Sequence, residues 1–168
     1  MDARKANSPA AKNNTIVERT SDREIVVTRT FNGPARIVFE AWTKPELFKR
    51  WWAPKSLGMS LLSVEQDVRV GGGYKLVFGH DASQSMAFHG RYLEVTPPSR
   101  LVWTNEESDD APVTTVTFEG QGEGTLLVMS ELYPSAEPVA EAVAGMQAMT
   151  AEQFAQLDEL LASGRPSA

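Results

Sequence analysis

The two histidines, His80 and His89, are the residues best suited by type to acid–base or metal chemistry near neutral pH. Asp81 follows the first, so the three side chains together could supply donors for a catalytic metal ion. Their spacing fits no metal-binding motif, and we predict no metal site. His89 is a candidate polar group inside a binding cavity, but Tyr92 competes for that position. Alternate strand residues face opposite sides of a sheet, so only one of the two points inward unless Gly90 forms a bulge.

The other groups of chemically suited residues favour structural roles. The acidic run Glu106, Glu107, Asp109 and Asp110 lacks the ligand spacing of a calcium loop and is expected to form a solvated turn. The glycines at 71–73 precede a strand-like segment, so they lack the helix N-terminus that a phosphate-binding loop needs. The sequence contains no cysteine and no G-x-S-x-G motif. We therefore predict no catalytic nucleophile and no cofactor.

The composition is typical of one globular domain. The 168 residues are 42% hydrophobic and 23% charged, and 16 basic against 22 acidic side chains give a net charge of −6. This acidic balance argues against nucleic acid as a partner, because phosphate binding needs clustered Lys and Arg. No apolar run approaches the ~18 residues of a membrane span, and the N-terminal residues lack the apolar core of a signal peptide. We expect a cytoplasmic protein without a membrane span.

Hydrophobic periodicity divides the chain into one strand, two short helices, six further strands and a long helix. We predict a flexible tail over residues 1–20, one domain over residues 22–162 and a second tail over residues 163–168. The strands are expected at 24–31, 61–68, 74–78, 86–95, 100–105, 113–120 and 124–132, and the helices at 35–42, 46–52 and 137–162. The sequence Thr43-x-x-Glu46 has the form of a capping box for the second helix.

This order of elements predicts an α+β fold. A largely antiparallel sheet of about seven strands is too wide to stay flat, so its twist would curl it around the long C-terminal helix. The core would then lie on the concave face of the sheet.

Four segments together resemble a known family: TRTFNGPARIVFEAWTKPELFKRWWAP, GGGYKLVF, HGRYLEVTPPSRLVWT and TVTFEGQGEGTLLVMSE. They are similar to the activator-of-heat-shock-protein-ATPase homologue (AHSA)-like family of the START-like (SRPBCC) superfamily, which includes polyketide cyclases and lipid-transport proteins. The similarity spans about residues 22–162. It implies a helix-grip fold in which the gap between the sheet and the C-terminal helix forms a cavity for apolar ligands. The family often has Gly-Trp near the middle of the last helix, where this sequence has Gly145-Met146.

Bulky and soft side chains on the inward phases of the strands and the long helix could line such a cavity. Adjacent helix residues cannot share one face, so at most one of Trp51 and Trp52 would do so. The same apolar residues could instead form a close-packed core without a void. The candidate ligand-binding residues are Trp42, Trp51, Tyr74, Leu76, Phe78, His89, Tyr92, Trp103, Thr114, Val116, Phe118, Leu127, Met129, Met146, Met149 and Phe154.

The leading functional hypothesis is non-catalytic binding of a small hydrophobic or amphipathic ligand, such as a lipid, a polyketide-like molecule or an aromatic metabolite. The resemblance implies an alternative, a protein-interaction module with a chaperone ATPase as its partner. A further alternative is a cyclase or hydrolase that uses His89 or a buried Glu94 in the pocket. Leu126 and Val128, on the outward phase of the last strand, could also form a patch for a homodimer.

Overall fold

The computed structural model describes residues 15–58, 60–81, 83–106 and 109–163. It contains a single antiparallel sheet of eight strands in the order β1-β2-β8-β7-β6-β5-β4-β3. The strands are β1 (Ile16–Ser21), β2 (Glu24–Asn32), β3 (Ser60–Gln66), β4 (Gly73–Asp81), β5 (Gln84–Thr96), β6 (Arg100–Thr104), β7 (Val113–Gln121) and β8 (Gly124–Leu132). The helices are α2 (Ala35–Thr43), α3 (Pro45–Trp51), the short 3-10 helix η1 (Lys55–Leu57) and α4 (Val139–Ser163). The predicted α+β fold is confirmed.

The sheet has one strand more than the sequence predicted. Residues 16–20, which we assigned to the N-terminal tail, form β1 together with Ser21. This strand pairs with β2 from Ile16 opposite Thr28 to Ser21 opposite Glu24. Most of the side chains of β1 are exposed, so the segment lacks the inward apolar period by which a strand is recognised. Ser163, predicted to begin the second tail, is the last residue of α4. Residues 1–14 and 164–168 of the predicted tails lie outside the described residues.

The centre of the sheet alternates strictly between buried and half-buried side chains. Val27 and Phe31 of β2, Val116 of β7 and Leu127 of β8 are all buried on the concave face. The β7–β8 hairpin closes through a turn in which Gly122 has a φ of 66°, as its glycine-rich sequence predicted. This alternation places the core on the face that α4 covers.

The junction between the two short helices α2 and α3 lacks the predicted capping box. The Thr43 hydroxyl donates to the carbonyl oxygen of Phe39 within α2 at 3.0 Å, so it does not cap α3. The N-cap of α3 is Lys44, which makes no side-chain capping bond, and Pro45 occupies the first turn. The Trp51 indole N–H donates to the carbonyl oxygen of Ala41 at 2.9 Å and ties the helices together. The capping-box prediction was wrong because the threonine remains inside the preceding helix.

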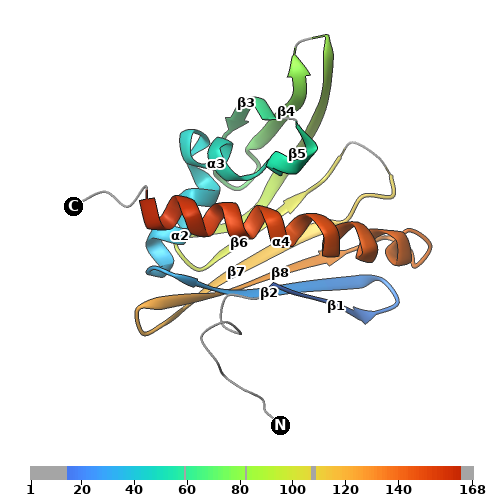
Figure 1. Ribbon diagram of the computed structural model, residues 1–168. Helices are drawn as coiled ribbons and strands as arrows, with labels where there is room; N and C mark the ends of the chain where they lie inside the picture. The colour runs from blue at the N-terminus through green and yellow to red at the C-terminus, as the bar shows by residue number, and fades with distance from the viewer. Residues whose placement is uncertain (1–14, 59, 82, 107–108, 164–168) are drawn as a thin grey trace.

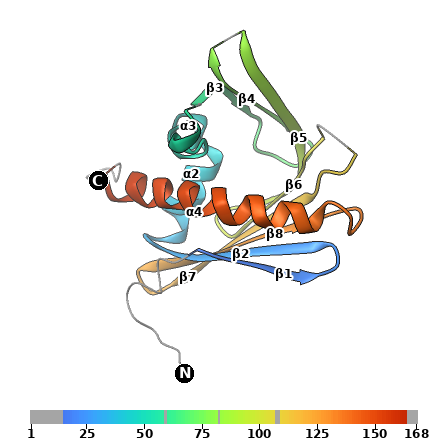
Figure 2. The same ribbon diagram turned by 45° about the vertical axis from the view of Figure 1, so that its right-hand side comes forward.

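The long helix α4 lies across the concave face of the sheet, with α2 and α3 beside its C-terminal half (Figures 1 and 2). Gln156 joins it to the end of α3 and the segment that follows: its Nε2 donates to the carbonyl oxygens of Trp51 and Ala53, both at 2.9 Å. Its Oε1 accepts the backbone N–H of Lys55 at 2.9 Å. Gln153 donates to the carbonyl oxygen of Trp52 at 2.6 Å. These bonds fix the C-terminal half of α4 against the helical corner.

No helix among the described residues has both the length and the apolar character needed to cross a membrane.

Candidate functional site

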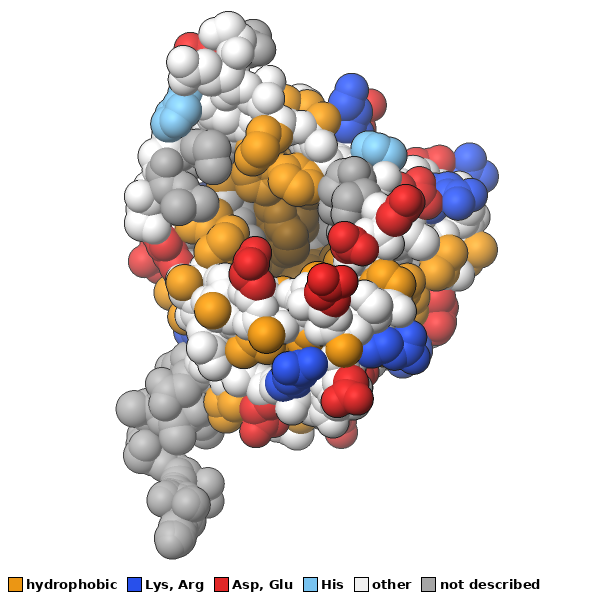
Figure 3. Space-filling view, turned by 90° about the vertical axis from the view of Figure 1, so that its right-hand side faces the viewer, with side chains coloured by type: hydrophobic (Ala, Val, Ile, Leu, Met, Phe, Trp, Pro, Cys, Tyr) orange, Lys and Arg blue, Asp and Glu red, His pale blue; other side chains and the backbone are white. Residues whose placement is uncertain are grey.

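A cavity of about 430 Å³ lies between the sheet and α4. Its lining comes from α2 and α3, from strands β3, β4, β5, β6 and β8, and from α4 between Ala142 and Gln153. Side chains surround it on the concave face, and Figure 3 shows the opening as a hollow lined by hydrophobic groups. The interior of the fold is therefore incompletely filled, as the sequence hypothesis required.

Many of the candidate ligand-binding residues do line this cavity. Apart from Trp42 of α2, they share the inward strand phase or the sheet-facing side of α4. Met149 is 40% exposed and lies where the cavity meets solvent. The candidates that line the cavity are Trp42, Tyr74, Leu76, Phe78, Tyr92, Trp103, Met129, Met146 and Met149.

Seven candidates do not line the cavity, and for these our expectation of cavity contact was wrong. Five of them belong to the main cluster of buried core residues instead. The ring of Phe154 contacts that of Phe31 edge-on, for example, with centroids 5.4 Å apart. Thr114 is buried behind the rim, and His89 is exposed on the other side of the sheet. The seven residues are Trp51, His89, Thr114, Val116, Phe118, Leu127 and Phe154.

The competition between His89 and Tyr92 is settled by the strand register. The β4–β5 ladder runs without interruption from Gly73 opposite Arg91 to Gly79 opposite Ser85, so Gly90 forms no bulge. Tyr92 faces the cavity and is 4% exposed, whereas His89 points to solvent.

Glu94, which we considered as a buried pocket acid, is also outside the cavity. An irregularity in the β5–β6 pairing lies between Tyr92 and Glu94. The Glu94 side chain is 42% exposed, and its carboxylate accepts a hydrogen bond from Arg100 Nε at 3.0 Å. Neither residue proposed for cyclase or hydrolase chemistry therefore reaches the cavity.

A polar cluster that the sequence analysis missed is part of the cavity wall. Gln66 Nε2 donates to the carbonyl oxygen of Trp42 at 3.0 Å and to the Tyr92 hydroxyl at 3.3 Å. Gln66 Oε1 and the indole Nε1 of Trp42 are buried without a hydrogen-bond partner among the described residues. Burial raises the pKa of Tyr92 to about 12, so its phenol is neutral at physiological pH. Buried polar atoms are normally paired, so these two are exceptions within the packed wall of the cavity.

Acidic and amide groups lie at another part of the wall. The Glu131 carboxylate accepts the Thr114 hydroxyl at 2.9 and 3.1 Å, and Asn105 Nδ2 donates to the same hydroxyl oxygen at 3.0 Å. Tyr133 lies beside them, and burial together with the charge of Glu131 raises its pKa to about 12. Figure 3 shows acidic side chains along the lower rim of the opening.

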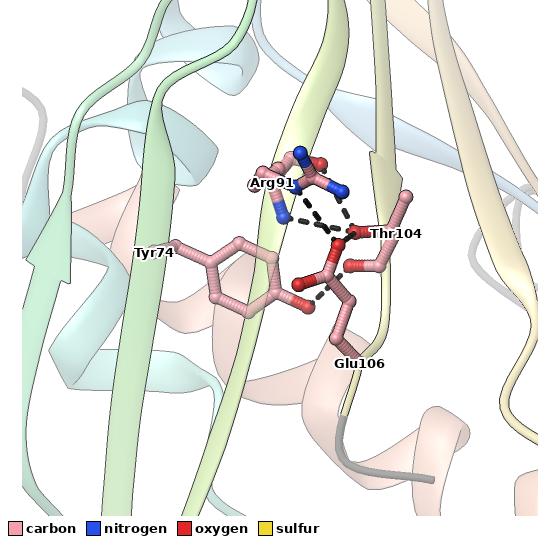
Figure 4. Close-up of polar contacts among 4 residues, drawn as sticks. All are labelled: Tyr74, Arg91, Thr104 and Glu106. Carbon is pink, nitrogen blue, oxygen red and sulfur yellow. Dashed lines mark hydrogen bonds and ion pairs between the residues drawn. The ribbon is translucent and has the colours of Figure 1, made fainter. Parts of the chain in front are cut away.

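A surface network holds the strands that carry the aromatic wall (Figure 4). The Tyr74 hydroxyl donates to the carbonyl oxygen of Thr104 at 2.8 Å. The Glu106 carboxylate accepts the Thr104 hydroxyl at 2.9 Å and Arg91 Nε at 3.0 Å. These bonds to Thr104 and then to Arg91 lower the pKa of Glu106. Glu106 thus acts in strand pairing, while Glu107 of the same acidic run lies outside the described residues.

Several aromatic and amide residues of the wall were not predicted from the sequence. Phe88 shares the inward phase of Tyr92, and that alternation could have identified it. Trp52, rather than Trp51, lines the cavity, since it follows α3 and its ring stacks on Phe48 with centroids 4.8 Å apart. Nothing in the sequence indicated that Gln66 lines the cavity, because a polar residue near the end of a strand is usually exposed.

The outer face of the sheet carries Leu126 and Val128, both half-buried. Both lie on the phase of β8 opposite to the buried Leu127 and Met129. Self-association through this face stays a prediction.

Comparison with known proteins identifies a family and a fold. The activator of Hsp90 ATPase homolog 1-like family matches residues 32–162. A solved protein from Nitrosomonas europaea shares 22% identity with a TM-score of 0.77, covering 88% of this chain and 99% of that one. One from Rhodobacter sphaeroides shares 22% identity with a TM-score of 0.80, covering 89% and 98%. The AHSA1-like protein from Aeromonas hydrophila shares 20% identity with a TM-score of 0.68, covering 85% and 96%. No curated protein matches the sequence.

Proposed function

The chain belongs to the activator of Hsp90 ATPase homolog 1-like family, and from that premise we propose that it binds a small hydrophobic or amphipathic molecule without chemical change. The observation that carries this proposal is the cavity of about 430 Å³ between the sheet and α4. This volume falls within the ~300–1,000 Å³ range of small-molecule sites. The ligand would be an aromatic metabolite, a lipid or a polyketide-like molecule.

The lining supports binding by burial of apolar surface. The lining includes the rings of Trp42, Trp103 and Phe78 and the thioethers of Met129 and Met146. Each Å² of apolar ligand surface removed from water contributes roughly 25 cal/mol before the losses of association are subtracted. Methionine side chains can adapt to ligands of different outline.

Analysis of bound molecules in the purified full chain tests this proposal. Protein from cells would be examined by native mass spectrometry, denatured and extracted with organic solvent. A hydrophobic molecule present at near-equimolar ratio in the native protein and released on unfolding is the expected result. A thermal-shift screen of apolar metabolites complements it, because a ligand that binds the native state raises its melting temperature. Absence of both a co-purified molecule and any stabilising compound would argue against the proposal.

The family description favours a second candidate, stimulation of a chaperone ATPase through a protein surface. The two candidates differ in what they require of the cavity. Under the second, a variant with a filled cavity, such as Leu76→Trp, would still stimulate the ATPase of an Hsp90-type chaperone from the same cell. Ligand binding would be lost in that variant, so the two assays separate the candidates.

We also propose that the protein acts in the cytoplasm. The sequence contains no cysteine, so a reducing compartment would leave the covalent structure of the fold unchanged. Fractionation of cells that produce the tagged chain tests it.

A further inference from the structure

We propose that a ligand enters and leaves the cavity beside Gly145 and Met149 of α4, and that the absence of a side chain at Gly145 sets how bulky a ligand can pass. This inference rests on the proposed function, because it assigns the route by which a ligand reaches the same cavity. Three observations support it: the exposure of the lining residues, the space around Gly145 and the backbone conformation of Gly145.

The exposure of the lining residues locates the opening of the cavity. Among the described residues that line it, only Gly145 and Met149 are exposed, and every other one is half-buried or buried. The two are four positions apart in α4, so they lie on the same side of the helix, one turn from each other. The cavity therefore meets solvent along this side of α4, and Figure 3 shows the hollow from outside.

The space around Gly145 is open. A Cβ atom built at this position would meet no neighbouring atom within 4 Å. At Gly79, by contrast, a Cβ atom would lie 2.3 Å from the carbonyl oxygen of Gln84. Close packing therefore does not require glycine at position 145, and a larger side chain there can project over the opening without a clash at its first atom.

The backbone of Gly145 does not require glycine either. The residue lies in the interior of α4, and the described glycines with a positive φ are Gly33, Gly58, Gly71 and Gly122. Glycine inside a helix is less stable than alanine, because it loses more backbone freedom on folding. Gly145 is also the one glycine among the described lining residues. Its position at the opening accounts for a residue that neither packing nor backbone geometry demands.

The two exposed residues affect passage differently. Met149 is 40% exposed and has an unbranched, flexible side chain, which can move aside for a ligand. A ring at position 145 would instead narrow the opening. A ligand built of rings cannot reduce its own width as an alkyl chain can, so we expect its rate of passage to depend most on residue 145.

Stopped-flow fluorescence of the full chain tests the route. The probe is N-phenyl-1-naphthylamine, a neutral three-ring dye that fluoresces in apolar surroundings. We expect Gly145→Phe to lower both the association and the dissociation rate constant at least about tenfold and to leave the dissociation constant within about threefold, because an obstructed route raises the barrier equally in both directions. Gly145→Leu should slow both steps by a smaller factor.

Two further variants serve as controls. Ala148→Phe places the same ring at an exposed position of α4 that does not line the cavity, and it should leave both rate constants unchanged. Gly145→Ala should raise the melting temperature by about 2–4 °C, since alanine favours the helix and its Cβ atom meets no neighbour. A lower melting temperature would show that the fold itself requires this glycine and would overturn the inference. Circular dichroism confirms that each variant is folded.

The outcomes separate the two proposals. Unchanged rate constants in folded Gly145→Phe and Gly145→Leu would overturn the proposed route and leave ligand binding in place. Weaker binding with an unchanged or faster dissociation would also overturn it, because residue 145 would then contact the bound ligand rather than obstruct its passage. Failure of the dye to bind the unmodified protein would overturn the proposed function itself.

Discussion

Tyr74 lies directly opposite Gly90 in the β4–β5 ladder, and its hydroxyl reaches across to the carbonyl oxygen of Thr104 at 2.8 Å. A Cβ atom on Gly90 would lie 2.0 Å from that oxygen and 2.8 Å from Cε2 of the Tyr74 ring. Because Gly90 has no side chain, strands β4, β5 and β6 can approach one another around the Tyr74 ring, which lines the cavity. The position illustrates how a residue without a side chain can determine the shape of a binding site.

The first prediction concerns this contact. Gly90→Ala forces the Thr104 backbone or the β5 strand to move, and we expect a loss of about 1–3 kcal/mol or more in the free energy of unfolding. Denaturant unfolding measures it. Gly120→Ala is the matched control, because nothing lies within 4 Å of a Cβ built there. Equal stabilities of the two variants would contradict the close approach.

The second prediction concerns alkaline pH. Burial raises the pKa of Tyr92 from 10.0 to about 12. The folded state therefore favours the neutral phenol. Its contribution to stability is complete below pH 10 and is lost as the pH rises from 10 to 12. A shift of this size corresponds to on the order of 2–3 kcal/mol.

Unfolding free energies measured between pH 9 and 12 test this prediction. Tyr92→Phe should reduce the loss of unfolding free energy at alkaline pH. A smaller loss should remain, because Tyr133 also has a pKa raised to about 12. An unchanged alkaline profile in Tyr92→Phe would show that Tyr92 titrates normally.

The third prediction concerns the attachment of α4. Gln156→Ala leaves the carbonyl oxygens of Trp51 and Ala53 and the N–H of Lys55 without their side-chain partner. We expect a loss of roughly 1–3 kcal/mol, because buried polar groups lose their bonds. Gln147→Ala, at an exposed position of the same helix, should change stability by less than about 0.5 kcal/mol. Thermal and denaturant unfolding measure the stability of both variants. Equal losses of stability in Gln156→Ala and Gln147→Ala would show that the Gln156 bonds contribute nothing.

The fold could be predicted from the sequence because apolar residues recur along it with the periods of strands and helices. Alternation placed Leu76, Phe118 and Leu127 on the inward phase of their strands, and all three are buried there. The exposed strand β1 has no buried face and so gave no such signal. The helix spacing placed Phe154 toward the sheet, and its side chain is buried.

The division between cavity wall and packed core could not be predicted from the same pattern. Leu127 and Met129 are two residues apart on one face of β8, yet only Met129 lines the cavity. The difference arises from the separation between α4 and the sheet, which many distant contacts determine together. Gln66, Gln153 and Gln156 were missed because buried amides are recognisable only from the groups that they bond.

The fourth prediction compares two leucines on the inward face of the sheet. Leu76 lines the cavity, whereas Leu101 is packed in the core and does not. Tryptophan at position 76 can extend into the void, so its stability should lie within about 1 kcal/mol of the original protein. Tryptophan at position 101 overpacks the core and should lose about 1–3 kcal/mol or more. If Leu76→Trp is less stable than Leu101→Trp, the void beside Leu76 is contradicted.

The most direct test of the central claim is a titration of N-phenyl-1-naphthylamine onto the unmodified chain and onto Leu76→Trp, followed by fluorescence. The account predicts saturable one-to-one binding to the unmodified protein. It predicts at least about tenfold weaker binding to a folded Leu76→Trp, because the new indole occupies the space of the guest. Binding of equal strength to both proteins, or no saturable binding to the first, would contradict a functional cavity between the sheet and α4.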